Sequence, residues 1–376
     1  MRKIALAIGL MAVFSNQALA KDSTQSLREA LSAIPESGGT TLAPMLAYFF
    51  DVQAWRDNGK EVPSLASLNR LALAVQIEPL QRLDLNMLSN WTQKAGVRFA
   101  DIEYFVGFGE QPRLVTLWGL KDETAADGLL TKLKKMDFAE VPGGIPGLLG
   151  NGGIEGKMDL RKADPFNPWR GFQGKAYYVK PFGSKLVQAS SPETMIALSA
   201  PKQTMADAPY VAPALDGLKG ALTGSEDKII QAVVISPSIG LSARAPAGLV
   251  TQQPATADEL RDGPTTKSDG LPHYLGGLMA DVQRKRPGMV VSLTYSNCEM
   301  AEQAIKYLKA SAVAFEASGI DAEIAGALVT ASKPFCAATV TFDTTADGQS
   351  ANPLLSRVME SYMRRDLQLL RIAEEE

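Results

Sequence analysis

The sequence predicts an α+β fold of two similar halves, each an antiparallel sheet with helices packed on one face. Three observations predict this fold. Short runs rich in β-branched and aromatic residues come in pairs joined by turn-forming residues, which is typical of hairpins. A run with apolar residues at helical spacing follows each pair. The order of runs over 21–205 is repeated over 206–376, which indicates that one α+β unit is present twice.

The first unit begins with a short amphipathic helix expected over 27–34 and an aromatic-rich strand over 45–52. Ser64 and Ser67 are residue types that favour helix N-caps, so short helical pieces are expected after them. Two hairpins follow, and a helix comes after each of them. The remaining elements are expected as helices through 73 and over 79–92, a hairpin of 102–106 with 113–118, a helix over 123–136, a hairpin of 175–180 with 185–189, and a helix over 191–198.

The second unit repeats this order with longer runs. Its centre is a strand–helix–strand stretch, in which a β-rich run over 289–295 precedes a helical pattern over 299–318 and a second β-rich run over 335–342. The other elements are expected as strands over 229–236 and 274–282 and a C-terminal helix over 352–371.

Four stretches are expected to be irregular. Glycine and proline dominate 141–156, and two prolines interrupt 164–171. The stretch 201–213 has the composition of a linker, and 237–270, rich in Pro, Ala, Thr, Ser and Gly, is expected to be a long surface loop.

The first 20 residues have the pattern of a secretory signal peptide. Arg2 and Lys3 precede an apolar run over 4–14, and the small-x-small sequence 18–20 predicts cleavage after Ala20. The alternative is an uncleaved anchor, although the run is shorter than the ~20 residues that span a bilayer. No later stretch has the length of a transmembrane helix. The formal net charge is −3, so a basic surface for nucleic acid is not expected.

The chain has two cysteines, Cys298 and Cys336, and they lie 38 positions apart. In an exported chain the simplest interpretation is one structural disulfide. The alternative is a redox-active or metal-binding pair, which this spacing without a neighbouring histidine does not favour.

Three segments resemble those of a class of secreted bacterial proteins of unknown function. They are 113–122 ahead of a helix, 185–193, and 271–274 ahead of a strand. The resemblance implies a duplicated α+β unit in the periplasm or outside the cell. The class has no known active site, so the resemblance implies no catalytic residues.

The sequence contains no strong catalytic, metal or nucleotide motif. A Ser-His-Asp triad or a Cys–His pair would have to use His273, the one histidine, which sits at an expected strand start. Ser-x-x-Lys occurs at 199–202 and 225–228, but without a matching Lys-Thr-Gly. The acidic run 343–348 has incomplete spacing for a calcium loop. No cofactor or metal is therefore expected.

Aromatic residues gather in or beside the irregular stretches. Aromatic side chains on loops often form binding surfaces for a partner or an apolar ligand. The alternative is that these rings cap the core. The residues of this predicted surface are Trp55, Phe166, Trp169, Phe172 and Tyr177, with Tyr178 beside them.

These observations together predict a non-catalytic periplasmic or secreted protein that binds another envelope protein or an apolar ligand. Two alternatives stay open. One is a hydrolase of the cell envelope that uses carboxylates alone, as glycosidases do, although no Asp or Glu pair stands out. The other is a carrier of an apolar ligand.

Overall fold

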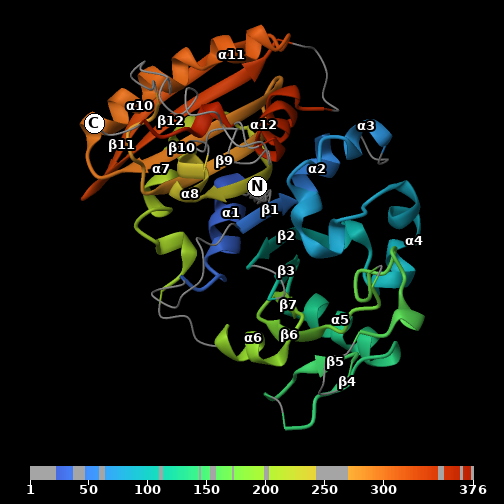
Figure 1. Cartoon of the computed structure of the whole chain (residues 1–376). Helices are drawn as coiled ribbons and strands as arrows, with labels where there is room; N and C mark the ends of the chain where they lie inside the picture. The colour runs from blue at the N-terminus through green and yellow to red at the C-terminus, as the bar shows by residue number, and fades with distance from the viewer. Residues whose placement is uncertain are drawn as a thin grey trace, which may run out of the picture.

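A computed structural model of the chain describes residues 23–36, 47–58, 64–109, 113–143, 145–152, 158–171, 173–198, 203–242, 270–345, 351–364 and 367–373. The predicted signal peptide, Phe172 and most of the expected loop 237–270 lie outside these ranges. Helices and a large antiparallel sheet make up the described chain, which confirms a mixed α+β fold (Figure 1).

The strands form one continuous twelve-stranded sheet, and every neighbouring pair is antiparallel. Its order is β11-β12-β10-β9-β8-β1-β2-β3-β7-β6-β5-β4. The strands are β1 (Ala47–Asp51), β2 (Ile102–Phe108), β3 (Val115–Leu120), β4 (Ala139–Glu140), β5 (Leu149–Gly150), β6 (Tyr178–Phe182), β7 (Lys185–Ala189), β8 (Lys228–Ile235), β9 (Gly276–Gln283), β10 (Pro287–Tyr295), β11 (Ala322–Ser332) and β12 (Phe335–Thr344).

The expectation of two separate sheets differs from this structure, because β1 and β8 pair at the centre. Tyr48, Phe49 and Phe50 lie opposite Val233, Ala232 and Gln231. Outward from this pair the strands run β8, β9, β10, β12, β11 on one side and β1, β2, β3, β7, β6, β5, β4 on the other. The first five strands of each side follow a similar order, while the duplication of one unit stays a prediction.

Helices cover both faces of the sheet rather than one (Figure 1). Consecutive strand residues belong to different cores: Val290 packs on the face of α1 and α7, and Val291 packs on the face of α10 and α12. Both faces of these strands are apolar, so both must be buried. The helices are α1 (Ser23–Leu31), α2 (Val52–Asn58), α3 (Leu65–Leu68), α4 (Leu85–Ala95), α5 (Glu123–Lys135), α6 (Pro192–Ala197), α7 (Ala212–Ala221), α8 (Pro237–Ser242), α10 (Cys298–Ala310), α11 (Ala312–Ala317) and α12 (Pro353–Met363).

Local sequence signals account for several helix ends. Asp122 accepts a hydrogen bond from the Ala125 amide at the start of α5, as an N-cap does. Asp84 caps α4 in the same way, and Gly96 ends that helix with a left-handed φ of 79°. The β2–β3 hairpin, the helix after it and the β6–β7 hairpin lie close to their predicted positions.

Several predictions about elements differ from the structure. The helix expected over 299–318 is divided at Ser311 into α10 and α11, and the C-terminal helix ends at Met363 rather than near 371. The strand β11 was missed. The predicted linker 201–213 contains a buried 3₁₀ turn, Met205–Asp207, and the start of α7. The predicted loop 237–270 begins with α8.

The predicted disulfide between Cys298 and Cys336 is present, with the two Cα atoms 5.0 Å apart. It joins the first residue of α10 to β12, so it ties a helix to the sheet that the helix covers. Within the described residues, no helix combines the length and the apolar character needed to cross a membrane.

Candidate functional site

An apolar pocket lies where the two sides of the sheet meet, and we name it the seam pocket. Its lining comes from the sheet, from the segment after α3, from α8, and from α12 with the segment that follows it. The lining residues are Tyr48, Leu73, Val233, Ile235, Ile239, Met279, Val358, Met359, Tyr362, Leu367 and Leu370. Apart from two tyrosine hydroxyls, these side chains are apolar.

Three of the lining residues form one row across the central strands, and we call this row the floor of the pocket. Tyr48 of β1 lies opposite Val233 of β8, and Val233 lies opposite Met279 of β9. Residues directly opposite in antiparallel strands point to the same face of the sheet. The seam pocket therefore has a floor built from both sides of the sheet.

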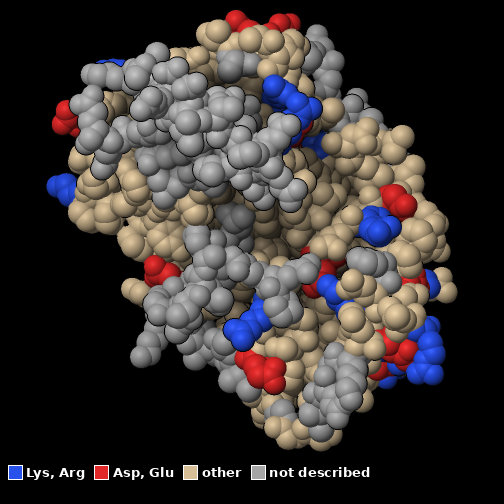
Figure 2. Space-filling view, in the orientation of Figure 1, with Lys and Arg blue, Asp and Glu red and all other residues tan. Residues whose placement is uncertain are grey.

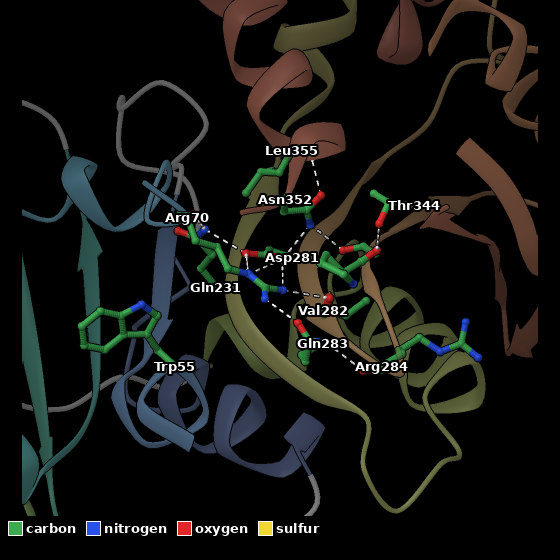
Figure 3. Close-up of polar contacts among 12 residues, drawn as sticks. Trp55, Arg70, Gln231, Asp281, Val282, Gln283, Arg284, Thr344, Asn352 and Leu355 are labelled. Atoms are coloured by element: carbon green, nitrogen blue, oxygen red, sulfur yellow. Dashed lines mark hydrogen bonds and ion pairs between the residues drawn. The ribbon is translucent and has the colours of Figure 1, made fainter. Parts of the chain in front are cut away.

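A buried polar network lies beside this floor (Figure 3). Arg70 donates from Nη2 to Asp281 Oδ1 at 2.7 Å and from Nε to Oδ2 at 3.0 Å. The Arg70 side chain is 1% exposed and the Asp281 side chain 0% exposed. Asp281 also accepts hydrogen bonds from Gln231 Nε2 at 3.0 Å and Asn352 Nδ2 at 2.7 Å. Because both carboxylate oxygens are occupied, this group does not have the geometry of a general base.

The network and the floor lie on the same face of the sheet. Gln231 comes two residues before Val233 in β8, and Asp281 comes two residues after Met279 in β9, so these side chains point to the same side. Gln231 Oε1 accepts hydrogen bonds from the amides of Leu73 and Ala74, at 2.9 and 3.1 Å. This contact holds one wall of the pocket, since the Leu73 side chain is part of the lining.

Asn352 holds the opposite wall. Its Nδ2 donates to Asp281 and to the Gly288 carbonyl, both at 2.7 Å, while its Oδ1 accepts from the Leu355 amide as the N-cap of α12. The buried network therefore positions the 73–74 segment and α12 relative to the floor between them. The first turn of α12 is anchored, whereas Tyr362 and Met363 at its other end are 37% and 73% exposed.

The pocket has a volume of about 30 Å³, which is room for on the order of two water molecules. Its lining is uncharged at neutral pH. Burial, and to a smaller extent the nearby Tyr362, raises the pKa of Tyr48 to about 12, so its phenol keeps its proton. A pocket with almost no polar lining favours an apolar group over water.

The predicted aromatic surface is placed differently by the structure. Trp55, Trp169 and Tyr177 are at most 2% exposed, Tyr178 is fully buried, and Phe166 is partly buried against the core that contains Trp55 and Trp169. Trp169 stacks on Trp118 with ring centroids 4.4 Å apart. These rings are core residues, as the alternative interpretation states: Trp55 lies in α2, Tyr178 lies in β6, and the irregular stretch around Trp169 packs against the sheet. Phe172 lies outside the described residues.

The indole N–H groups explain how two of these rings are buried. Trp55 Nε1 donates to the Ser67 carbonyl at 3.0 Å, and Trp169 Nε1 donates to the Ala95 carbonyl at 3.1 Å. A buried indole needs such an acceptor, and here carbonyls in the last turns of α3 and α4 supply it. The sequence shows the aromatic residues but not these acceptors.

The other sequence candidates do not come together. His273 is exposed, and Lys228 of the second Ser-x-x-Lys forms an ion pair with Asp57. Asp343 forms an ion pair with Arg284, and the first Ser-x-x-Lys lies outside the described residues. In the described ranges no three His, Cys, Asp or Glu residues are grouped as metal ligands. On the face seen in Figure 2, described basic side chains mostly lie near acidic ones.

The seam pocket was not predicted from the sequence. Its residues are spread from 48 to 370. One signal was visible: Gln231 and Asp281 interrupt two otherwise apolar strand runs. A polar residue inside a buried strand needs buried partners, so these two positions indicated a polar contact at the centre of the sheet.

The sequence matches no protein-family model, no curated protein and no solved structure at a significant level.

Proposed function

We propose that this chain is a non-catalytic binding protein of the periplasm or extracellular space, and that it takes an apolar group into the seam pocket. The observation that carries the proposal is the apolar lining over a floor shared by both sides of the sheet. The Cys298–Cys336 disulfide and the predicted signal peptide support an exported location, because disulfides persist in oxidising compartments. The two sides of the sheet would descend from one duplicated unit, which their strand order supports.

The size of the pocket limits what it accepts. Pockets for whole small molecules have volumes of about 300–1,000 Å³, and the cavity here is about 30 Å³. Without movement it admits the end of an acyl chain or one small apolar group. A longer ligand requires the free end of α12 to move outward. The exposure of Tyr362 and Met363 makes that end the wall that moves, while Asn352 keeps the start of α12 in place.

The test measures binding of an uncharged single-chain probe, 1-decanol, to purified protein by titration calorimetry, because the end of such a chain fits the pocket without movement of α12. Met359→Lys places a charge on the pocket lining, and we expect it to weaken binding about tenfold or more, because an ammonium is costly beside apolar walls. Met363→Lys is the matched control. It makes the same substitution four residues along α12 at a side chain that does not line the pocket, and it should leave affinity unchanged.

A second variant avoids added charge. Val233→Leu adds one methylene group at the floor, so it fills the cavity and should also weaken probe binding, at a stability cost under about 1.5 kcal/mol. Circular dichroism checks that each variant is folded. Absence of binding to the wild-type protein, or equal weakening by both lysine variants, would overturn the proposal.

A further inference from the structure

The two edges of the sheet differ in how they are protected. The edge strand β4 is two residues long, and its Glu140 forms an ion pair with Lys134 at 3.0 Å. The edge strand β11 is eleven residues long, and among the described strands β12 is its one neighbour. Exposed edges are normally short, charged, bulged or covered, because their unpaired backbone groups bind other strands.

Only the first part of β11 has such protection. Glu323 carries the one charge in the strand, and the register with β12 shifts between Ile324 and Gly326, which leaves Ala325 as a bulge. From Gly326 to Ser332 the pairing with β12 is regular, and the sequence Gly-Ala-Leu-Val-Thr-Ala-Ser contains no charge and no proline. A Cβ built on Gly326 would meet no atom within 4 Å.

We infer that this regular segment, 326–332, pairs antiparallel with the same segment of a second copy of this chain. The segment is self-complementary about a two-fold axis at Val329. In that register Val329 faces its own copy, Ala327 faces Ala331, and Leu328 faces Thr330. Small residues therefore meet small ones, and β-branched and aliphatic residues meet each other, which are favourable cross-strand pairs.

The charges also fit a second copy. Glu323 lies outside the paired segment, so no two like charges oppose each other across the pair. The partner's strand would find both faces of the edge already supported: α7 packs beside Leu328 and Thr330 on one face, and Ala327 and Val329 pack with the α10–α12 core on the other. Two sheets would then join edge to edge in an isologous dimer. This inference is independent of the seam pocket.

The first test is the mass of purified protein over a range of concentrations, by light scattering or sedimentation. We expect a dimer. Ala331→Lys adds a charge at an exposed edge position and should weaken dimerisation about tenfold or more. Ala139→Lys is the matched control, because it makes the same change at an exposed residue of the other edge, β4, and it should stay dimeric.

A covalent test examines the register. The two cysteines of the chain are bonded to each other, so Val329→Cys introduces the one free thiol. Two such thiols would face each other at the two-fold axis, and mild oxidation should yield a covalent dimer, whereas Ala139→Cys should not.

Three results would overturn the inference. They are a monomeric wild-type protein at all concentrations, an Ala331→Lys variant that is folded by circular dichroism and as dimeric as the wild type, and an Ala139→Lys variant that is folded and monomeric. A dimer in which Val329→Cys does not crosslink would overturn the register centred on Val329.

Discussion

The Arg70 guanidinium and the Asp281 carboxylate form an ion pair at 2.7 Å from which water is almost excluded. Arg70 follows α3 in the first half of the sequence, and Asp281 lies on β9 in the second, 211 positions away. Together with Gln231 and Asn352, the pair joins segments from both sides of the sheet (Figure 3). Its effects on stability and on the seam pocket can be measured.

Removal of Arg70 should destabilise the fold strongly. In Arg70→Met, Asp281 would be left as a buried carboxylate without its cation, and breaking a buried pair in this way costs about 3–5 kcal/mol. Urea denaturation measures this cost. The matched control is Arg28→Met, which breaks an Arg28–Asp216 pair of the same 2.7 Å distance that is 40% and 44% exposed, so it should cost under about 1 kcal/mol. Equal costs at the two sites would contradict this prediction.

Asn352 should contribute more than an ordinary N-cap. Asn352→Ala removes the cap of α12 and takes one buried donor each from Asp281 and the Gly288 carbonyl, so we expect a loss of about 2–4 kcal/mol. Asn297→Ala is the control, because Asn297 caps α10 from an exposed position and its loss should cost about 1 kcal/mol.

Binding measurements add a second readout to this prediction. Because Asn352 anchors the start of α12, Asn352→Ala should also weaken probe binding in the seam pocket, and Asn297→Ala should not. A variant at Asn352 that loses no more stability than the one at Asn297 would show that the buried contacts contribute little.

Two helical glycines should respond to the same substitution in opposite directions. Gly217 lies where α7 crosses the sheet, and an added Cβ would collide with Thr339 Oγ1 and lie 2.7 Å from Ser292 Oγ. Gly217→Ala should therefore cost about 1–3 kcal/mol. An added Cβ at the exposed Gly128 of α5 meets nothing within 4 Å, so Gly128→Ala should raise stability by roughly 0.5–1 kcal/mol. Thermal and urea denaturation would measure both, and a stabilised Gly217→Ala would contradict the close approach of α7.

Buried tyrosines should make the fold sensitive to alkaline pH. Burial raises the pKa of Tyr48 to about 12, and burial also raises the pKa values of Tyr104, Tyr177, Tyr274 and Tyr295. In the unfolded chain these phenols ionise near pH ~10. The folded state therefore holds more protons above that pH, and the stability present below about pH 10 should be lost as the pH rises toward about 12.

The measurement is the urea midpoint at a series of alkaline pH values, together with a tyrosinate absorbance titration. Stability should be constant just below pH ~10 and fall above it. Tyrosines that all ionise near pH ~10 in the folded protein, or a midpoint that does not change up to about pH 12, would contradict the burial of these hydroxyls.

The strand β11 shows why one element was missed. Its sequence, Ala-Glu-Ile-Ala-Gly-Ala-Leu-Val-Thr-Ala-Ser, has no clear alternation, because it is an edge strand with partly exposed residues on both faces. The prediction of a linker over 201–213 is wrong for a different reason. Its prolines and alanines are typical of a linker, yet Met205 and Val211 are buried against the sheet.

The aromatic residues show why the sequence alone does not reveal which side chains lie on the surface of the protein. Trp55 and Trp169 lie in or beside irregular stretches, and their indole N–H groups find carbonyl acceptors only after distant segments have come together. The residues that line the seam pocket are likewise ordinary core residues in the sequence. What distinguishes them is that Leu73, Met279 and Val358 meet on one face of the sheet.

The sequence by itself determined local elements: the hairpins, the start of α5 after Asp122, and the single disulfide. These depend on neighbouring residues, on capping side chains and on the presence of two cysteines. Only the tertiary structure decided that β1 and β8 join all strands into one sheet, and that a pocket and a buried ion pair lie at that junction. Backbone groups are the same in every strand, so side chains show which strands exist but not which edges pair.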